Sequence, residues 1–183
     1  MKIPKSVWPN IITLGNLTLG MMAIMLVIIS TPRNDFLIKA SFIVMFAALT
    51  DRLDGKVARR LNAVSDLGKE LDSLADLVSF GIAPAVIAWK MCLVTLGPVG
   101  AIICVIYPIA GAYRLARYNS TEFENVYYGV PITIAGALLS LVNLIDSFAI
   151  IKNRFTLVYT IVTAVFCLLL SFLMVSRIRV EKR

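Results

Sequence analysis

Six long apolar runs occupy most of this chain and limit its fold more than any other feature. They cover residues 8–30, 36–60, 70–92, 95–117, 130–150 and 155–176. As an α-helix, about 20 consecutive apolar residues cross the hydrocarbon core of a bilayer. Only 16% of the residues are charged, compared with about 25% in soluble domains. The sequence therefore predicts an all-α integral membrane protein, built as a bundle of six transmembrane helices.

The basic residues predict how this bundle is oriented. Lysine and arginine are enriched in the segments that face the cytoplasm. If the N-terminus is cytoplasmic, 13 basic residues lie on the cytoplasmic side and 5 on the outer side. We therefore expect a multi-pass protein of the cell membrane with both termini in the cytoplasm. The connections are short, so residues 1–183 are expected to form a single membrane domain. Nothing in the pattern indicates binding of nucleic acid.

Acidic residues gather at the predicted cytoplasmic ends of the second and third spans. Six of the eleven acidic residues in the chain lie between positions 51 and 76. Residues three or four apart share one face of a helix, so Asp51 lies with Asp54, and Asp72 with Asp76. A short connection would place these two faces opposite each other. Because carboxylates at this depth normally face a polar cavity, we expect an active-site cavity that opens to the cytoplasm.

Divalent cations are the counter-charge that best fits four neighbouring carboxylates. The chain has no histidine, and hard oxygen ligands suit Mg²⁺, Mn²⁺ or Ca²⁺. The small residues Gly55 and Ala58 leave room on the face of Asp51 for an anionic ligand, and Arg59 can hold a phosphate in a forked contact. The alternative is a surface charge cluster in which aspartates and arginines pair within one helix.

Residues 51–76 read D-x2-D-G-x2-A-R-x8-G-x3-D-x3-D, with Gly68 as the isolated glycine. This pattern resembles the signature of the CDP-alcohol phosphatidyltransferases at every fixed position. Four further segments are similar to the bacterial phosphatidylserine synthases of that family, namely 9–20, 69–85, 113–119 and 128–136. The chain reads "DSLAD" where phosphatidylglycerophosphate synthases usually read "DPLAD".

The resemblance implies a transferase of phospholipid biosynthesis. Such an enzyme moves the phosphatidyl group from CDP-diacylglycerol to the hydroxyl of L-serine and releases CMP. The family pattern implies two divalent cations, Mg²⁺ or Mn²⁺, with the ligands Asp51, Asp54, Asp72 and Asp76. Asp76 is then also the general base. The CDP and phosphate groups are expected to lie against Gly55, Ala58, Arg59 and Gly68. A homodimer in the membrane is implied as well.

Polar residues outside the signature are candidates for the remaining contacts. We expect the serine carboxylate and ammonium groups to bind Arg114, Arg117 and Asn119, at the end of the fourth span. Ordinary flanking charge is the alternative reading of the two arginines. In the first span, Thr13 and Asn16 are expected to line the cleft or to form hydrogen bonds between helices.

Two other functions fit parts of the sequence. The same chemistry with glycerol 3-phosphate or inositol phosphate as acceptor would favour a denser basic pocket than serine requires. A divalent-cation transporter would carry acidic residues near the bilayer midplane, often in repeated halves. We expect no repeat, and no acidic residue within the apolar stretches of the fifth and sixth spans, so the transporter is the more distant alternative.

Overall fold

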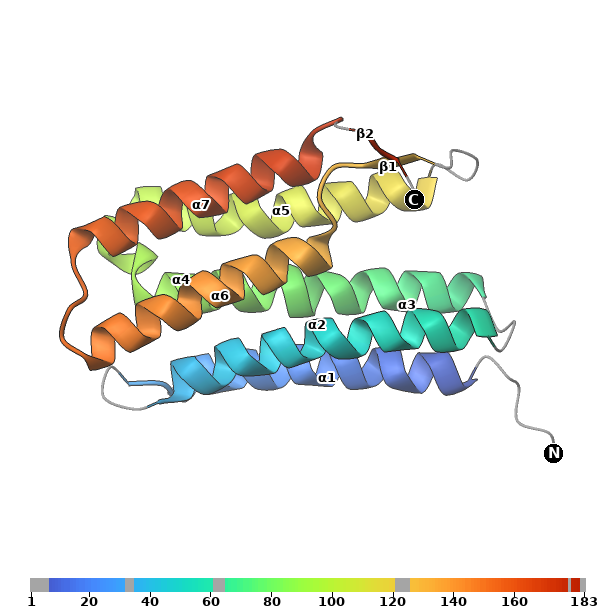
Figure 1. Cartoon of the computed structure of the whole chain (residues 1–183), viewed down its shortest axis with the longest axis horizontal. Helices are drawn as coiled ribbons and strands as arrows, with labels where there is room; N and C mark the ends of the chain where they lie inside the picture. Colours follow the sequence, from blue (N-terminus) through green and yellow to red (C-terminus); the bar gives the residue numbers. More distant parts are fainter. Residues whose placement is uncertain (1–6, 32–34, 61–64, 121–125, 178, 182–183) are drawn as a thin grey trace.

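The structure, a computed structural model, describes residues 7–31, 35–60, 65–120, 126–177 and 179–181. Within these residues it is a bundle of long helices with one very short sheet (Figure 1). The helices are α1 Val7–Ile29, α2 Phe36–Arg60, α3 Asp66–Asp76, α4 Ala83–Met91, α5 Pro98–Ser120, α6 Ile132–Ile151 and α7 Leu157–Val175. A π-helical segment, η1 Leu77–Ile82, joins α3 to α4, and a short 3-10 helix, η2 Leu93–Leu96, precedes α5.

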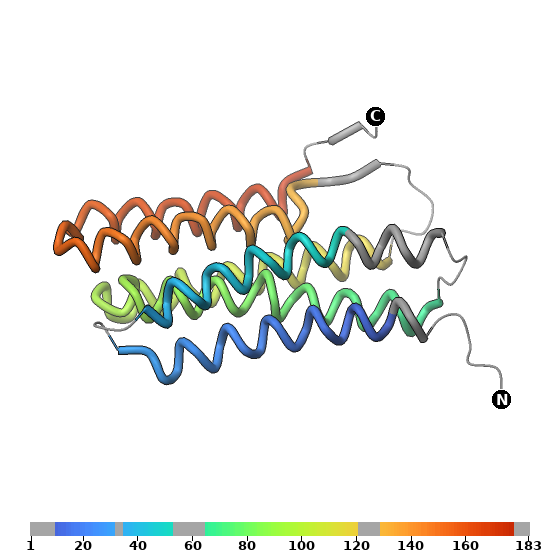
Figure 2. The backbone as a smooth tube through the Cα atoms, turned by 60° about the horizontal axis from the view of Figure 1, so that its bottom comes forward, coloured from blue at the N-terminus to red at the C-terminus, as the bar shows by residue number. Residues whose placement is uncertain are grey.

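Five helical segments in the described part of the chain are long and apolar enough to cross a membrane. They are Asn10–Ile28, Asp66–Met91, Pro98–Ser120, Ile132–Ile151 and Leu157–Val175. The predicted all-α membrane bundle is therefore confirmed. The sixth predicted span corresponds to α2, whose 25 residues include the charged Lys39, Asp51 and Arg52. Helix α2 packs against α1 and α6 within the bundle (Figure 2), but six membrane spans are not established.

The two ends of the bundle differ in which segments they bring together. Helix α1 begins and α7 ends at the same end, where α2 also ends and α3 begins (Figure 1). The end of α2 and the start of α3, which carry most of the acidic residues, therefore lie at the end of the bundle that holds both ends of the described chain. The opposite end holds the connection between α6 and α7 (Figure 1).

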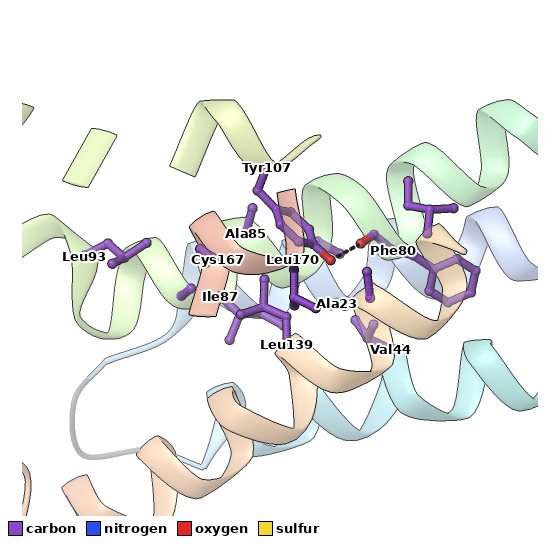
Figure 3. Close-up of a cluster of buried hydrophobic side chains, with 14 of the residues drawn as sticks. Ala23, Val44, Phe80, Ala85, Ile87, Leu93, Tyr107, Leu139, Cys167 and Leu170 are labelled. Carbon is purple, nitrogen blue, oxygen red and sulfur yellow. Dashed lines mark hydrogen bonds between the residues drawn. The ribbon is translucent and has the colours of Figure 1, made fainter. Parts of the chain in front are cut away.

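Neighbouring helices pack closely against the π-helical segment of the continuous helix formed by α3, η1 and α4. A Cβ atom on Gly20 of α1 would lie 2.7 Å from the Cα atom of Ser79, and one on Gly136 of α6 would lie 2.7 Å from that of Phe80. Small residues permit this close approach of helices in membranes. From α5, the buried Tyr107 hydroxyl donates to the carbonyl of Phe80 at 3.3 Å (Figure 3). The segment just after Asp76 is therefore held from three sides.

Two short strands depart from the all-helical expectation. Strand β1 Val126–Tyr128 pairs antiparallel with β2 Arg179–Glu181. Beside them, Gly129 has a φ of 72°, and a Cβ atom there would lie 2.6 Å from the carbonyl oxygen of Met174. Only glycine tolerates both conditions without strain. The sheet ties the segment before α6 to the segment after α7.

Candidate active site

Three aspartates from two helices come together at one end of the bundle. One carboxylate oxygen from each of Asp51, Asp72 and Asp76 lies within 4.8 Å of the other two. Asp51 is on α2, whereas Asp72 and Asp76 are one turn apart on α3. The side chain of Asp76 is buried, and those of Asp51 and Asp72 are half-buried. Among the residues that the structure describes, this is the single group of three or more acidic, cysteine or histidine side chains so close together.

Local structure at the start of α3 sets where its two aspartates lie. Ser65 is the N-cap, and its hydroxyl accepts a hydrogen bond from the backbone N–H of Gly68 at 3.1 Å. A Cβ atom on Gly68 would lie 3.1 Å from Oδ1 of Asn10 in α1. A larger residue at this position would require the side chains of Asn10 and Ser65 to shift slightly. Gly68 thus lies close to the side chains of Ser65 and Asn10, and the nucleotide contact expected for it stays a prediction.

Thr133 is a member of the site that the sequence did not predict. It lies in the first turn of α6, and its hydroxyl donates to Oδ2 of Asp51 at 3.2 Å. Asp51 is also in hydrogen-bonding contact with Asp76. Residues that orient a ligating carboxylate strongly influence metal affinity. The available signal was a hydroxyl residue two positions after Pro131, at the start of an apolar run.

The three aspartates fit a hard divalent cation. Mg²⁺ and Ca²⁺ bind oxygen ligands at about 2.0–2.6 Å, so two oxygens on opposite sides of one ion are about 4–5 Å apart. The carboxylate oxygens of the cluster lie within that separation. Carboxylates that share a site repel one another, and a cation between them removes this repulsion. The arrangement can therefore hold a metal ion without a large movement of either helix.

Several predicted site residues fall where the side chains are not described. These positions follow Asp51 in α2 and are Asp54, Gly55, Ala58 and Arg59. The helix itself continues through all of them. The fourth metal ligand and the phosphate-binding arginine thus lie outside the described side chains.

Among the three residues predicted to bind the acceptor, Asn119 contacts α3 and Arg114 is buried in the bundle. The Nδ2 atom of Asn119 donates to Oγ of Ser73 at 3.0 Å and to Oε1 of Glu70 at 3.4 Å. Ser73 is the immediate neighbour of Asp72 in α3. Arg114 is only 9% exposed, although arginine is rarely buried in proteins unless it is paired. It shares one face of α5 with Tyr107, two turns away.

Arg117 has a different environment. Its guanidinium donates to the carbonyl oxygens of Val175 at 2.9 Å and Ser176 at 3.4 Å, at the end of α7. It also lies over the ring of Tyr113, 5.9 Å from the ring centroid. Helix C-termini have unpaired carbonyl groups that favour a cation. In this structure Arg117 therefore fastens α5 to the end of α7.

The two polar residues predicted in the first span are buried against the central helix. Thr13 is 6% exposed and Asn16 is 2% exposed. The backbone carbonyl of Asn16 accepts a hydrogen bond from the hydroxyl of Ser79 at 3.0 Å. Within the described part of the chain, Oδ1 of Asn16 has no hydrogen-bond partner. This face of α1 therefore turns toward α3 and η1 rather than toward lipid.

The expectation that the fifth and sixth spans carry no acidic residue in their apolar stretches is wrong, because Asp146 lies in the fifth. Asp146 is inside α6 and only 2% exposed, and its Oδ2 accepts a hydrogen bond from Thr163 of α7 at 2.6 Å. It lies toward the end of the bundle opposite the acidic cluster. Nearby, Asn143 donates to the carbonyl of Pro84 at 2.9 Å. Such hydrogen bonds between helices explain polar residues in this part of the membrane bundle.

Comparison with known proteins identifies the family. The chain matches the model of the CDP-alcohol phosphatidyltransferase family over residues 6–176. It belongs to this family. It is also 35% identical over 172 residues to a Bacillus subtilis protein named CDP-diacylglycerol–serine O-phosphatidyltransferase, covering 93% of this chain and 88% of that protein.

Two further relatives carry the same name. The protein from Helicobacter pylori strain 26695 is 35% identical over 180 residues, which cover 96% of this chain and 72% of the relative. The protein from Methanocaldococcus jannaschii is 34% identical over 171 residues, which cover 93% of this chain and 72% of the relative. The family is metal-dependent, and the cluster of Asp51, Asp72 and Asp76 is where this member can hold a metal ion.

Proposed function

We propose that this chain transfers the phosphatidyl group of CDP-diacylglycerol to the hydroxyl of L-serine, which yields phosphatidylserine and CMP. The observation that carries the proposal is the convergence of Asp51, Asp72 and Asp76 in a member of this family. The relatives that match nearly the whole chain are named for transfer to serine. Their names favour serine over glycerol 3-phosphate or inositol phosphate as the acceptor.

The acidic cluster is the proposed metal centre. Asp51, Asp72 and Asp76 would share the cations, and Asp54 would complete a set of four ligands for two ions, Mg²⁺ or Mn²⁺. When bound, such ions neutralise charge on the pyrophosphate and stabilise the departing CMP. Thr133, through its hydrogen bond to Asp51, would keep that carboxylate in a fixed orientation.

Asp76 is the proposed general base. The serine oxygen forms a bond to the phosphorus that carries the diacylglycerol. The bond from that phosphorus to the bridging oxygen of the pyrophosphate breaks, and its electron pair leaves with CMP. The proton of the serine hydroxyl passes to the Asp76 carboxylate. The chain contains no histidine, so a carboxylate is the appropriate group for this proton transfer.

Substrate recognition is assigned to residues around this cluster. Arg114 would pair with the serine carboxylate, because it is buried and always charged. Asn119 would assist from beside Ser73, whereas Arg117 would act mainly through α7. On the donor side, the CDP and phosphate contacts are Gly55, Ala58, Arg59 and Gly68, with Thr13 and Asn16 lining the cleft.

The orientation in the membrane follows from where these groups lie. Helix α1 begins and α7 ends at the end of the bundle that carries the acidic cluster (Figure 1). The basic residues favour the cytoplasmic side for this end, 13 against 5. Both termini and the active-site cavity would then face the cytoplasm, where soluble serine is available and CMP is released. The homodimer implied by the family resemblance stays a prediction.

An acceptor panel tests this proposal. Purified protein in detergent is incubated with CDP-dioleoylglycerol, Mn²⁺ and either L-serine, glycerol 3-phosphate or inositol phosphate, and CMP release is measured. Serine should support a kcat/KM far above that of either phosphorylated acceptor. The Asp76→Asn variant is the matched control for contaminating activity. Faster turnover of a phosphorylated acceptor would overturn serine as the substrate, and no CMP release with any acceptor would overturn the reaction itself.

A further inference from the structure

The first turn of α6 carries Thr133 and follows a residue that cannot cap a helix with its side chain. The N-cap residue is Pro131, and a proline side chain has no oxygen that could accept a capping hydrogen bond. Thr133 is the second residue of the helix, and its hydroxyl donates to Oδ2 of Asp51 at 3.2 Å. Hydrogen bonds weaken steeply outside a narrow range of distance and angle. The contact with Asp51 therefore depends on what fixes the first turn of α6 in space.

The backbone just before α6 lies against the end of α7. The N–H group of Val130 donates to the carbonyl of Leu173 at 3.2 Å. Gly129 is buried and has a φ of 72°, and a Cβ atom there would lie 2.6 Å from the carbonyl oxygen of Met174. The last carbonyls of a helix have no partner within the helix, so the end of α7 supplies acceptors. Glycine allows the chain to approach these carbonyls closely.

The side chain of Ile132 fixes the same turn against α5 and η1. Ile132 is the first residue of α6 and is only 1% exposed. A Cβ atom on Gly111 of α5 would lie 2.5 Å from Cδ1 of Ile132, and one on Gly81 of η1 would lie 3.5 Å from it. The glycine in α5 therefore leaves the space that the isoleucine side chain occupies. The residue directly before Thr133 is thus held by two other helical segments.

We propose that residues 129–132 are a positioning segment for the metal centre, because they place Thr133 on Asp51 and so set the orientation of that carboxylate. The inference rests on the proposed function. The β1–β2 pairing adds a second connection between the chain before α6 and the chain after α7. Arg117 belongs to the same arrangement, since its guanidinium donates to the last carbonyls of α7. The end of α7 thus acts on metal binding without contributing a ligand.

Mn²⁺ binding in the absence of substrates tests the proposal. Gly129→Ala puts a methyl group against the carbonyls of α7 at a positive φ, so residues 129–132 must shift. The Mn²⁺ Kd of the purified protein, measured by electron paramagnetic resonance, should rise about tenfold or more, as for other residues that orient metal ligands. Ile132→Ala should raise the Kd by a smaller factor. Ile132→Val, which keeps most of the buried side chain, should have less effect than Ile132→Ala.

A double-mutant cycle separates positioning from a general loss of stability. If residues 129–132 act through Thr133, Gly129→Ala should change the Kd by less than about twofold in a Thr133→Val background, whereas independent effects would multiply. Gly97→Ala is the matched control. Gly97 also has a positive φ, 57°, but it precedes α5 at the opposite end of the bundle (Figure 1). This control should lower thermal stability and leave the Mn²⁺ Kd unchanged.

Two results would overturn the positioning role. One is an unchanged Mn²⁺ Kd in folded Gly129→Ala and Ile132→Ala proteins, and the other is the same fold-change for Gly129→Ala with and without Thr133. If Gly129→Ala does not fold, Ile132→Ala decides through the same cycle.

The proposed reaction is judged by a separate measurement. Wild-type protein that binds Mn²⁺ but releases no CMP with serine would overturn the transferase function, and the Mn²⁺ Kd values would still decide the positioning role. Wild-type protein that binds no Mn²⁺ would overturn the metal centre and the positioning role together.

Discussion

Two regions of this bundle bury carboxylates, and they do so in different ways. At one end, Asp51, Asp72 and Asp76 place oxygens within 4.8 Å of one another. Toward the other end, Asp146 accepts a hydrogen bond from the hydroxyl of Thr163 at 2.6 Å. The first arrangement concentrates negative charge, whereas the second gives one acidic group a donor on a neighbouring helix.

The difference distinguishes a ligand-binding site from a structural hydrogen bond in a membrane protein. A lone buried acid can be stabilised by a hydrogen bond between helices, which contributes about 0.6 kcal/mol on average. Three carboxylates in one place each raise the cost of ionising the others. A divalent cation, as proposed for this cluster, would compensate the repulsion.

The largest expected effect is at the acidic cluster. Asp76→Asn removes the proposed base and one metal ligand, so kcat should fall about 10²–10⁴-fold. The amide has nearly the same shape as the carboxyl group, so the thermal unfolding temperature in detergent should change little. CMP release under saturating serine and Mn²⁺ measures the effect. An Asp76→Asn enzyme with kcat close to that of the wild type would remove Asp76 from the mechanism.

A smaller effect is expected one contact away from the cluster. Thr133→Val keeps the shape of the side chain but removes the donor to Asp51. The Mn²⁺ concentration for half-maximal activity should rise about 10–100-fold, as for other residues that orient metal ligands. Thr156→Val is a suitable control, because Thr156 is an exposed hydroxyl residue at the start of α7. The same Mn²⁺ dependence in both variants would mean that Thr133 has no part in metal binding.

Variants of the two arginines of α5 test which of them binds the substrate and which stabilises the fold. If Arg114 binds the serine carboxylate, Arg114→Ala should raise the serine KM about tenfold or more, the usual cost of a lost charge-assisted hydrogen bond. Arg117→Ala should instead lower thermal stability, because it frees the carbonyls of Val175 and Ser176. Steady-state kinetics and thermal melts in detergent distinguish the two. If Arg117→Ala raised the serine KM and Arg114→Ala only lowered thermal stability, the two arginines would have the opposite roles.

The smallest effect is expected at the isolated acid. Asp146→Asn retains an oxygen that accepts from Thr163, so activity should stay within about twofold and stability within about 1 kcal/mol of the wild type. Initial rates and thermal melts provide the measurement. A loss of activity as large as that of Asp76→Asn would show that both regions take part in function and would remove the distinction drawn above.

The features that follow from local pattern were predictable from the sequence. Apolar run length predicted five of the spans, and the spacing of Asp72 and Asp76 placed them on one helical face. Contacts between distant segments were not predictable. Nothing near Thr133 in the chain indicates that it meets Asp51, 82 positions earlier. The antiparallel β1–β2 pairing depends in the same way on two segments that meet only after folding.

The π-helical segment η1 is another feature that could not be predicted from the sequence. Its sequence, LVSFGI, has the composition of an ordinary apolar helix turn. The altered hydrogen bonding is accompanied by neighbours from three other helices, including the Tyr107 hydroxyl on the Phe80 carbonyl. Segments of this type are often found at functional sites, and this one begins directly after Asp76. That these residues form a π-helix beside the proposed base is visible only in the folded bundle.

Direct metal binding tests the central claim. Mn²⁺ binding to the purified protein, without substrates, is measured by electron paramagnetic resonance for the wild type, Asp72→Asn and Asp146→Asn. Asp72→Asn should raise the Kd at least about tenfold, because even residues behind the ligands have effects of that size, whereas Asp146→Asn should bind as the wild type does. Equal Mn²⁺ affinity in all three proteins would contradict the assignment of the three-aspartate cluster as the metal centre.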